Sequence, residues 1–234
     1  MPQTVSMPIG KWKTYPAYKD SGVEWLGQIP AHWGWKRLKY SVSFFGGGTP
    51  SKDNPDYWTG DIPWVSPKDM KGESVTGTEE HITEEAVAIS ATRLIPPGAV
   101  LVVVRSGILK HSIPVAINAV TVALNQDMKA LVPKSLLDAE YLKYLIVGHQ
   151  TALLVEWRKA GATVESLELE LIANMRVPIP PLSEQAGIVA FLRRETAKAD
   201  ALIHKLRADV LPEYRTALIS AAVTGKIDVR EVAA

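Results

Sequence analysis

The chain has 234 residues, of which 47% are hydrophobic and 22% charged; this is enough apolar material for a packed core and excludes a disordered class. It contains no cysteine, which excludes a disulfide scaffold and cysteine-based zinc sites and fits a reducing cytoplasm. No segment approaches the roughly 18 apolar residues of a membrane span, and the first residues lack the apolar core of a signal peptide. We therefore expect a cytoplasmic protein without a membrane partner.

Irregular structure with aromatic anchors is expected first, because six of the seven Trp lie within residues 1–64 among Gly and Pro. Strands are predicted at residues 99–106, 114–124 and 128–133. Each of these runs is apolar and partly β-branched, and Pro or Gly lies at or near its ends. The first part of the chain therefore contains strand-forming segments separated by turns.

Helical spacing follows over residues 136–157, with Gly148 as the expected break. A short connection then leads into a strand-like run at residues 175–179. Strands and helices in this order predict a mixed α+β domain over residues 1–180.

A second domain, residues 181–234, is predicted to begin as one long helix. Pro180 and Pro181 enforce an extended segment, and Ser183 is the expected N-cap. No further Pro occurs before Leu211, so the 29 residues from Ser183 would form a rod of about 43 Å.

One edge of this helix has the spacing of a coiled coil. Apolar or small residues recur at alternating steps of four and three, which predicts a seam for a second helix. The alternative, in which the helix folds onto its own domain, stays open. The seam residues are Leu192, Thr196, Ala199, Ile203, Leu206 and Val210.

The net charge of +1 conceals three blocks of opposite sign. Residues 1–52 contain seven Lys or Arg and two Asp or Glu, a net charge of +5. Residues 53–90 contain two Lys or Arg and nine Asp or Glu, a net charge of −7. Residues 91–135 contain five Lys or Arg and one Asp, a net charge of +4. Basic segments on either side of an acidic one could form a surface for a polyanion, although solvated faces alternate in the same way.

Three polar loops, at residues 44–52, 104–112 and 157–165, are candidates for contacts with nucleic acid. The first contains three consecutive glycines, which would let exposed backbone N–H groups approach phosphates. The other two contain Arg, the residue that most often reads guanine. The candidate DNA-binding residues are Gly48, Thr49, Ser51, Lys52, Lys68, Arg105, Ser106, Lys110, His111, Arg158 and Thr163.

A catalytic alternative is a magnesium-dependent nuclease. Asp56, Asp69 and Lys71 match the short pattern in which two carboxylates hold Mg²⁺ and a lysine orients water. The pattern is common, and Asp69 lies in an expected loop rather than on a strand. No other catalytic or metal-binding arrangement is predicted.

Several blocks of the sequence, in order, resemble the specificity (S) subunit of type I restriction–modification enzymes. They are "YKDSGVEWLGQIPAHWGWKRLKY" (18–40), "GGTPSKDNPDYWTGDIPWVSPKDM" (47–70), "IPPLSEQ" (179–185) and "LISAAVTGKIDVR" (218–230). The third block, at the start of the long helix, is the most specific.

This resemblance implies DNA recognition without catalysis. In the family, a target-recognition domain reads one half of a bipartite double-stranded site, and long helices act as a spacer and as a docking surface for methyltransferase subunits. The resemblance places S-adenosylmethionine on those partners, and ATP and Mg²⁺ on partners that include a motor and nuclease subunit. It implies no cofactor for the specificity subunit itself.

Each family block occurs once here, whereas family members usually carry two recognition domains and two helical regions. The chain is thus expected to correspond to half a subunit. A homodimer joined through the helical seam would restore two readers and would imply an interrupted palindromic target. A third hypothesis is a decoy that occupies methyltransferase partners without reading DNA.

Overall fold

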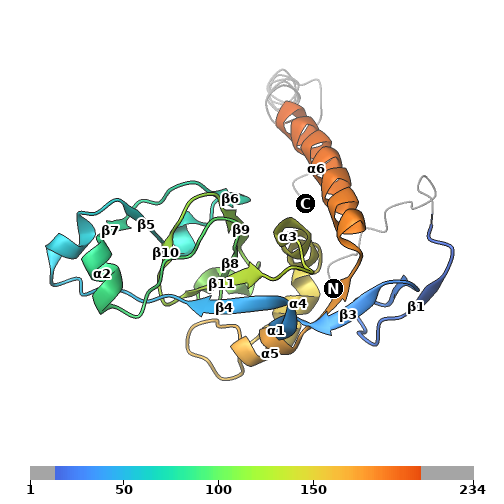
Figure 1. Cartoon of the computed structure of the whole chain (residues 1–234), viewed down its shortest axis with the longest axis horizontal. Helices are drawn as coiled ribbons and strands as arrows, with labels where there is room; N and C mark the ends of the chain where they lie inside the picture. The colour runs from blue at the N-terminus through green and yellow to red at the C-terminus, as the bar shows by residue number, and fades with distance from the viewer. Residues whose placement is uncertain (1–13, 207–234) are drawn as a thin grey trace, which may run out of the picture. The chain divides into compact units, whose positions relative to one another are not determined.

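The computed structural model describes residues 14–206 (Figure 1). The chain divides into two compact units, residues 1–186 and 187–234, and each is described by itself. The division falls inside the long helix, and the assignment of functions to residues 1–180 and 181–234 stays a prediction.

A five-stranded sheet forms the centre of the first unit, in the order β4-β11-β8-β9-β6. β11 is antiparallel to both of its neighbours, and the two-residue β6 is parallel to β9. All four residues of β8 are buried, as expected of a continuous apolar run in the middle of a sheet. The strands are β4 (Val42–Gly46), β6 (Ser74–Val75), β8 (Val100–Val103), β9 (Val115–Asn118) and β11 (Met128–Pro133).

A smaller three-stranded sheet, in the order β10-β5-β7, lies at the end of the unit that also carries α2 (Figure 1). It packs on its own cluster of buried residues, Trp64, Ile82, Ala86 and Ala123. The elements are β5 (Ile62–Val65), β7 (His81–Ile82), β10 (Ala123–Leu124) and α2 (Glu84–Ile89), with short 3-10 helices η2 (Pro55–Trp58) and η3 (Pro67–Asp69).

Two strand pairs and several helices complete the first unit. β1 (Tyr18–Asp20) pairs with β2 (Gln28–Pro30), and β3 (Gly34–Arg37) pairs with β12 (Arg176–Ile179), both antiparallel. The helices of this part are α1 (Leu38–Ser41), η4 (Gly107–Lys110), α3 (Ala139–Gly148), α4 (Gln150–Trp157) and α5 (Leu169–Asn174). α3 packs against β8 and β9, and α1 packs against α5.

The strand and helix predictions are largely confirmed. The runs at 99–106, 128–133 and 175–179 contain β8, β11 and β12, and the helix predicted over 136–157 breaks at Gly148 into α3 and α4. The run at 114–124 forms two strands, because residues 119–121 make a turn between β9 and β10. The start of the chain is more regular than expected, since it contributes β1 to β4 and α1.

The long helix α6 spans Leu182–Lys205, a length of about 36 Å. The predicted N-cap at Ser183 is wrong. The carbonyl of Pro181 accepts the N–H groups of Glu184 and Gln185, which makes Pro181 the cap and puts Ser183 inside the first turn. Within the described residues, no helix is long and apolar enough to cross a membrane.

Two side chains fix this first turn to the body of the first unit. Gln185 is fully buried; its Oε1 accepts the N–H of Asp138 at 2.8 Å, and its Nε2 donates to Leu136 O and Pro180 O, both at 2.9 Å. Glu184 accepts hydrogen bonds from Trp33 Nε1 at 2.9 Å and Tyr15 Oη at 3.2 Å and lies 2.7 Å from His32 Nε2. These contacts lower the pKa of Glu184 below its ordinary value, and the hydrogen bond from Trp33 has the largest effect.

Candidate nucleic-acid interface

Two of the three loops predicted to contact nucleic acid meet at one turn, Asn125–Asp127, which connects β10 to β11. From the first loop, Gly48 N–H donates to Leu124 O, just before this turn, and Thr49 Oγ1 donates to Gln126 Oε1. From the second, the N–H of Arg105 donates to Asp127 O at 3.3 Å.

The third loop joins the second directly. Ser106 N–H donates to Glu165 O at 3.0 Å, and Arg105 forms a β-bridge with Ser166. Arg158 forms the next bridge, with Leu167. Segments that are distant in sequence thus form one continuous surface, which the sequence did not reveal.

The glycine-rich loop differs from the prediction. Gly48 is buried rather than exposed, and its N–H is bonded to Leu124 while its carbonyl accepts Trp64 Nε1 at 3.0 Å. A Cβ at Gly47 would lie 2.0 Å from Asn125 O, and one at Gly48 would lie 2.8 Å from Thr92 N. The glycines serve close packing of the backbone against β10, so Gly48 is not free to bind phosphate.

Lys52 and Lys68 are exposed but lie in an acidic network. Lys52 Nζ is 2.6 Å from Glu80 Oε1 and 3.3 Å from the centre of the Trp58 ring, a cation–π contact. Lys68 Nζ lies 3.2 Å from Glu80 and 3.3 Å from Glu79. The hydrogen bond to Glu80 raises the pKa of Lys68, and the hydrogen bond from Lys52 lowers the pKa of Glu80.

Each of the two predicted arginines lies at ion-pair distance from a carboxylate. Arg105 Nε lies 3.5 Å from Asp127 Oδ1, and Arg158 Nε lies 3.4 Å from Glu165 Oε2. Neither contact is a hydrogen bond, and Asp127 Oδ1 has no hydrogen-bond partner among the described residues. Both arginine side chains are at least half exposed, at 58% and 50%. The terminal nitrogens of an exposed guanidinium are the atoms that make a bidentate contact with guanine.

The remaining candidates lie on the same loops and form no ion pair with any residue that the structure describes. Lys110 and His111, at the end of η4, are exposed, as are Ser51 and Thr163. Ser106 caps η4 by accepting the N–H of Ile108, so its hydroxyl is partly engaged. The structure thus brings together Thr49, Arg105, Ser106 and Arg158. A contact of any of these residues with a DNA base stays a prediction.

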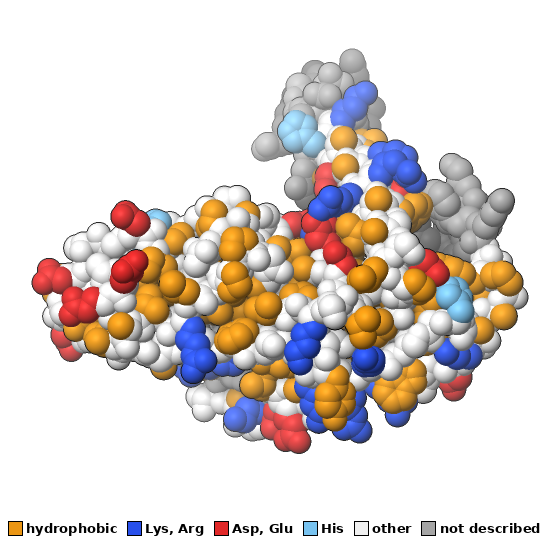
Figure 2. Space-filling model, in the orientation of Figure 1, with side chains coloured by type: hydrophobic (Ala, Val, Ile, Leu, Met, Phe, Trp, Pro, Cys, Tyr) orange, Lys and Arg blue, Asp and Glu red, His pale blue; other side chains and the backbone are white. Residues whose placement is uncertain are grey.

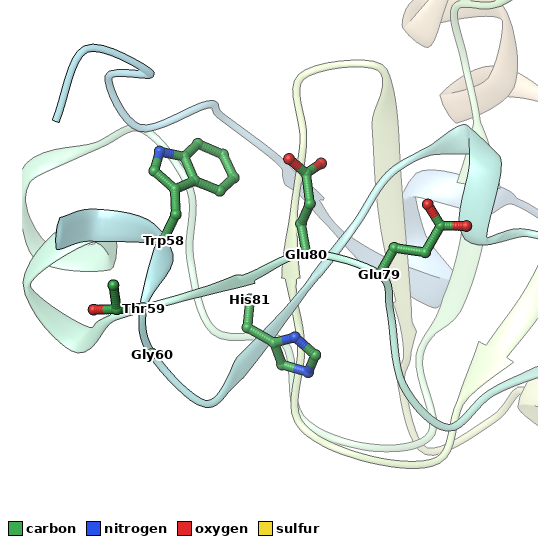
Figure 3. Close-up of a pocket in the computed structure, with 6 residues that line it drawn as sticks. All are labelled: Trp58, Thr59, Gly60, Glu79, Glu80 and His81. Carbon is green, nitrogen blue, oxygen red and sulfur yellow. The ribbon is translucent and has the colours of Figure 1, made fainter. Parts of the chain in front are cut away.

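A pocket of about 280 Å³ lies between η2 and the segment entering β7. Figure 3 shows the Glu80 carboxylate and the His81 ring projecting to opposite sides of the chain. Among the described residues, no group of three or more Asp, Glu or His could hold a metal ion. The pocket is lined by Trp58, Thr59, Gly60, Glu79, Glu80 and His81.

The residues of the nuclease alternative have structural partners. Asp69 caps η3 by accepting Ser66 N–H at 2.9 Å and Ser66 Oγ–H at 2.7 Å, and it accepts Glu79 N–H at 3.1 Å. Lys71 pairs with Glu79 at 2.9 Å. Asp56 is exposed in the first turn of η2. Turn formation therefore accounts for Asp69 without a metal.

Figure 2 shows where the charge blocks lie in the first unit: Asp and Glu side chains gather at the end that carries α2, β5 and β7. Lys and Arg side chains gather along the lower edge, around α1, β3 and α5. Acidic and basic side chains therefore gather in different parts of this unit, although Lys52 of the first basic block pairs with Glu80 of the acidic block.

Comparison with known proteins shows the family to which the sequence is related. The sequence profile described as "Type I restriction modification DNA specificity domain" matches residues 30–211. The chain is 35% identical over 200 residues to the specificity subunit of the type I restriction enzyme EcoR124I/EcoR124II from Escherichia coli, covering 85% of this chain and 48% of that subunit. It is 32% identical over 188 residues to the type I restriction enzyme MjaIX specificity subunit from Methanocaldococcus jannaschii, covering 78% and 41%. The chain thus spans about half the length of these relatives.

Solved structures show the same fold. The crystal structure of the HsdS subunit from Thermoanaerobacter tengcongensis matches with a TM-score of 0.61 and 22% identity, over 89% of this chain and 47% of that chain. A chain from a study of assembly and conformational transition of the type I R-M system matches with a TM-score of 0.62 and 22% identity, over 85% and 46%. The predicted α+β class with a long C-terminal helix is confirmed.

Proposed function

Because this chain belongs to the type I restriction–modification DNA specificity family, we propose that it recognises one half of a double-stranded DNA site and has no catalytic activity of its own. The observation that carries the proposal is that the first two loops meet at Asn125–Asp127 and the third pairs with the second, with the exposed side chains of Arg105 and Arg158 on these loops. Their terminal nitrogens would read base edges, and the neighbouring polar groups would fix the register on the backbone.

Catalysis would belong to partners. Methyltransferase subunits would bring S-adenosylmethionine, and ATP and Mg²⁺ would act on partners that include a motor and nuclease subunit. The long helix, which begins at the turn that Glu184 and Gln185 fix, would be their docking surface.

We propose that two copies pair through the seam of α6. Ile203 and Leu206 are 45% and 42% exposed, Ala199 is also exposed, and Leu192 and Thr196 are half-buried. Val210 lies outside the described residues. An exposed apolar edge of this kind is stabilised by a matching helix. A two-fold dimer would present two identical readers, and the rod of about 36 Å is comparable with one turn of B-DNA, about 34 Å.

The test is selection of bound sites from a randomised duplex library by the purified full chain, alone and with a cognate methyltransferase. We expect enrichment of an interrupted palindrome with half-sites about one turn or more apart. Enrichment of asymmetric sites would contradict the homodimer, and absence of any enrichment would contradict DNA reading and leave the decoy hypothesis. Incubation with plasmid and Mg²⁺ should leave the DNA intact.

A further inference from the structure

A second basic surface lies outside the predicted loops, on β3, α1 and the first residue of β12. On β3, Trp35, Lys36 and Arg37 are exposed, and Tyr40 on α1 is 64% exposed. Figure 2 shows Lys and Arg side chains gathered around α1 and β3 with hydrophobic side chains between them. We call this the stem patch; its residues are Trp35, Lys36, Arg37, Lys39, Tyr40 and Arg176.

The cations of the stem patch lack the carboxylates that surround the loop cations. In the described part of the chain, no Asp or Glu oxygen lies within 4.0 Å of a charged nitrogen of any of them, whereas Lys52, Lys68, Arg105 and Arg158 each have such a partner. Among the described residues, these cations therefore form no direct ion pair, so a polyanion would not have to displace a bound carboxylate.

Two of these cations converge on one neutral atom. Arg37 Nη1 and Lys39 Nζ both donate to Asn174 Oδ1, at 3.1 and 2.9 Å. Asn174 is itself held, because its Nδ2 donates to Glu170 O at 2.9 Å. Two like charges thus lie side by side around an amide oxygen, which orients them but does not neutralise them. Preoriented adjacent cations suit a phosphate group.

A third cation makes a cation–π contact with an exposed aromatic ring. The guanidinium of Arg176 lies 4.4 Å from the centre of the Trp35 ring, and its Nη1 donates to Gly22 O at 3.3 Å. Gly22 has a φ of +68°, and a Cβ there would lie 2.5 Å from Arg176 Nη1, so this close approach favours glycine.

The stem patch is joined to the predicted reading surface by α5. This helix begins two residues after Leu167, which bridges Arg158, and it ends at Asn174. Its six residues span about 9 Å, or roughly three base-pair steps of 3.4 Å. A duplex read by the loops would therefore reach the stem patch within a few base pairs.

We propose that the stem patch binds the phosphate backbone of the same duplex, with Arg37 and Lys39 as a phosphate clamp and Asn174 as its positioning residue. This inference rests on the proposed function and deepens it. Such contacts add affinity and set the register without reading sequence, whereas the loops discriminate between sequences.

The experiment measures binding of the full chain to a random-sequence duplex of about three helical turns between about 50 and 200 mM salt. The double variant Arg37→Gln, Lys39→Gln should reduce the slope of log affinity against log salt by about 1.8, since each phosphate contact contributes roughly 0.9. Lys71→Gln, which removes an exposed cation paired with Glu79, is the matched control and should leave the slope unchanged.

Asn174→Asp provides a second, shape-conserving variant. It keeps both cations but places a carboxylate between them, so it should also lower the slope while the protein stays folded, as checked by circular dichroism. A wild-type slope in both variants would overturn the proposal. If these variants keep the wild-type slope but lose binding to a methyltransferase partner, the ligand of the stem patch is an acidic protein surface and the proposal is equally overturned. The proposed function fails separately if the wild type binds with a steep slope but distinguishes no sequence.

Discussion

Gln185 shows how one side chain fixes the start of the long helix. It is fully buried with all three hydrogen bonds to backbone groups. Gln185→Ala leaves the N–H of Asp138 without its partner and opens a small cavity, so we expect the free energy of unfolding to fall by about 2–4 kcal/mol. Urea unfolding measures this. Ser183→Ala, at an exposed position of the same turn, should change the free energy of unfolding by less than about 0.5 kcal/mol. An equal loss in the two variants would contradict the role of Gln185 in fixing the start of the helix.

Glu184, its neighbour, should make stability depend on acid pH. Its folded pKa is lowered, so its contribution is complete above the unfolded pKa, about 4.3, and is lost as the pH falls through the folded pKa. The free energy of unfolding of the wild type should therefore decrease more than that of Glu184→Gln when the pH is lowered from 5 to 3. Urea unfolding at each pH measures the difference; parallel curves would contradict the lowered pKa.

Arg105 is the residue for which base reading is most directly testable. Arg105→Ala should reduce discrimination between the target and a variant site by about 1–3 kcal/mol, if the terminal nitrogens contact guanine. Arg105→Lys is the informative control, because it keeps the charge but lacks the planar fork. It should lose discrimination while keeping the salt slope. Competition binding with selected and mutated duplexes measures both; unchanged discrimination in Arg105→Ala would exclude a base contact.

The loops that carry candidate binding residues were predictable from the sequence, but the residues that these loops contact in space were not. The loop at 44–52 was recognisable from its glycines and lysine, yet the burial of Gly48 depends on β10, which is more than 70 residues away. The acidic partner of Lys52, Glu80, likewise comes from the segment before β7. The stem patch could not be predicted, because its residues on β3, α1 and β12 come together only through the pairing of β3 with β12.

At the scale of elements, local composition was sufficient to predict a strand where one or both of its faces are apolar. β8 and β11 are continuous runs bounded by turns, and the break at Gly148 was visible before α4. The two-residue strands β6, β7 and β10 carry no period of their own and exist only through pairing with longer partners. The N-cap was misplaced because Ser183 satisfies the local rule, whereas the Pro181 carbonyl takes the first helical bonds.

Pairing also explains how distant segments build both candidate surfaces. β3 precedes β12 by more than 130 residues, yet their register sets Arg37 opposite Arg176. α5 then carries Asn174 to the side chains of Arg37 and Lys39. The reading loops and the stem patch are therefore consequences of tertiary pairing, which no motif in the sequence encodes.

At the scale of the whole molecule, the decisive prediction is the proposed association through α6. Ile203 lies on the predicted seam, whereas the neighbouring His204 is exposed off it. Ile203→Glu would place a charge against its own copy, and Leu206→Pro would interrupt the helix, so both should convert a dimer into a monomer. His204→Glu should remain dimeric. Sedimentation equilibrium of the full chain measures the state of each variant. A wild type that stays monomeric at high concentration, or an unchanged dimer in both seam variants, would contradict pairing through this edge and the palindromic target that follows from it.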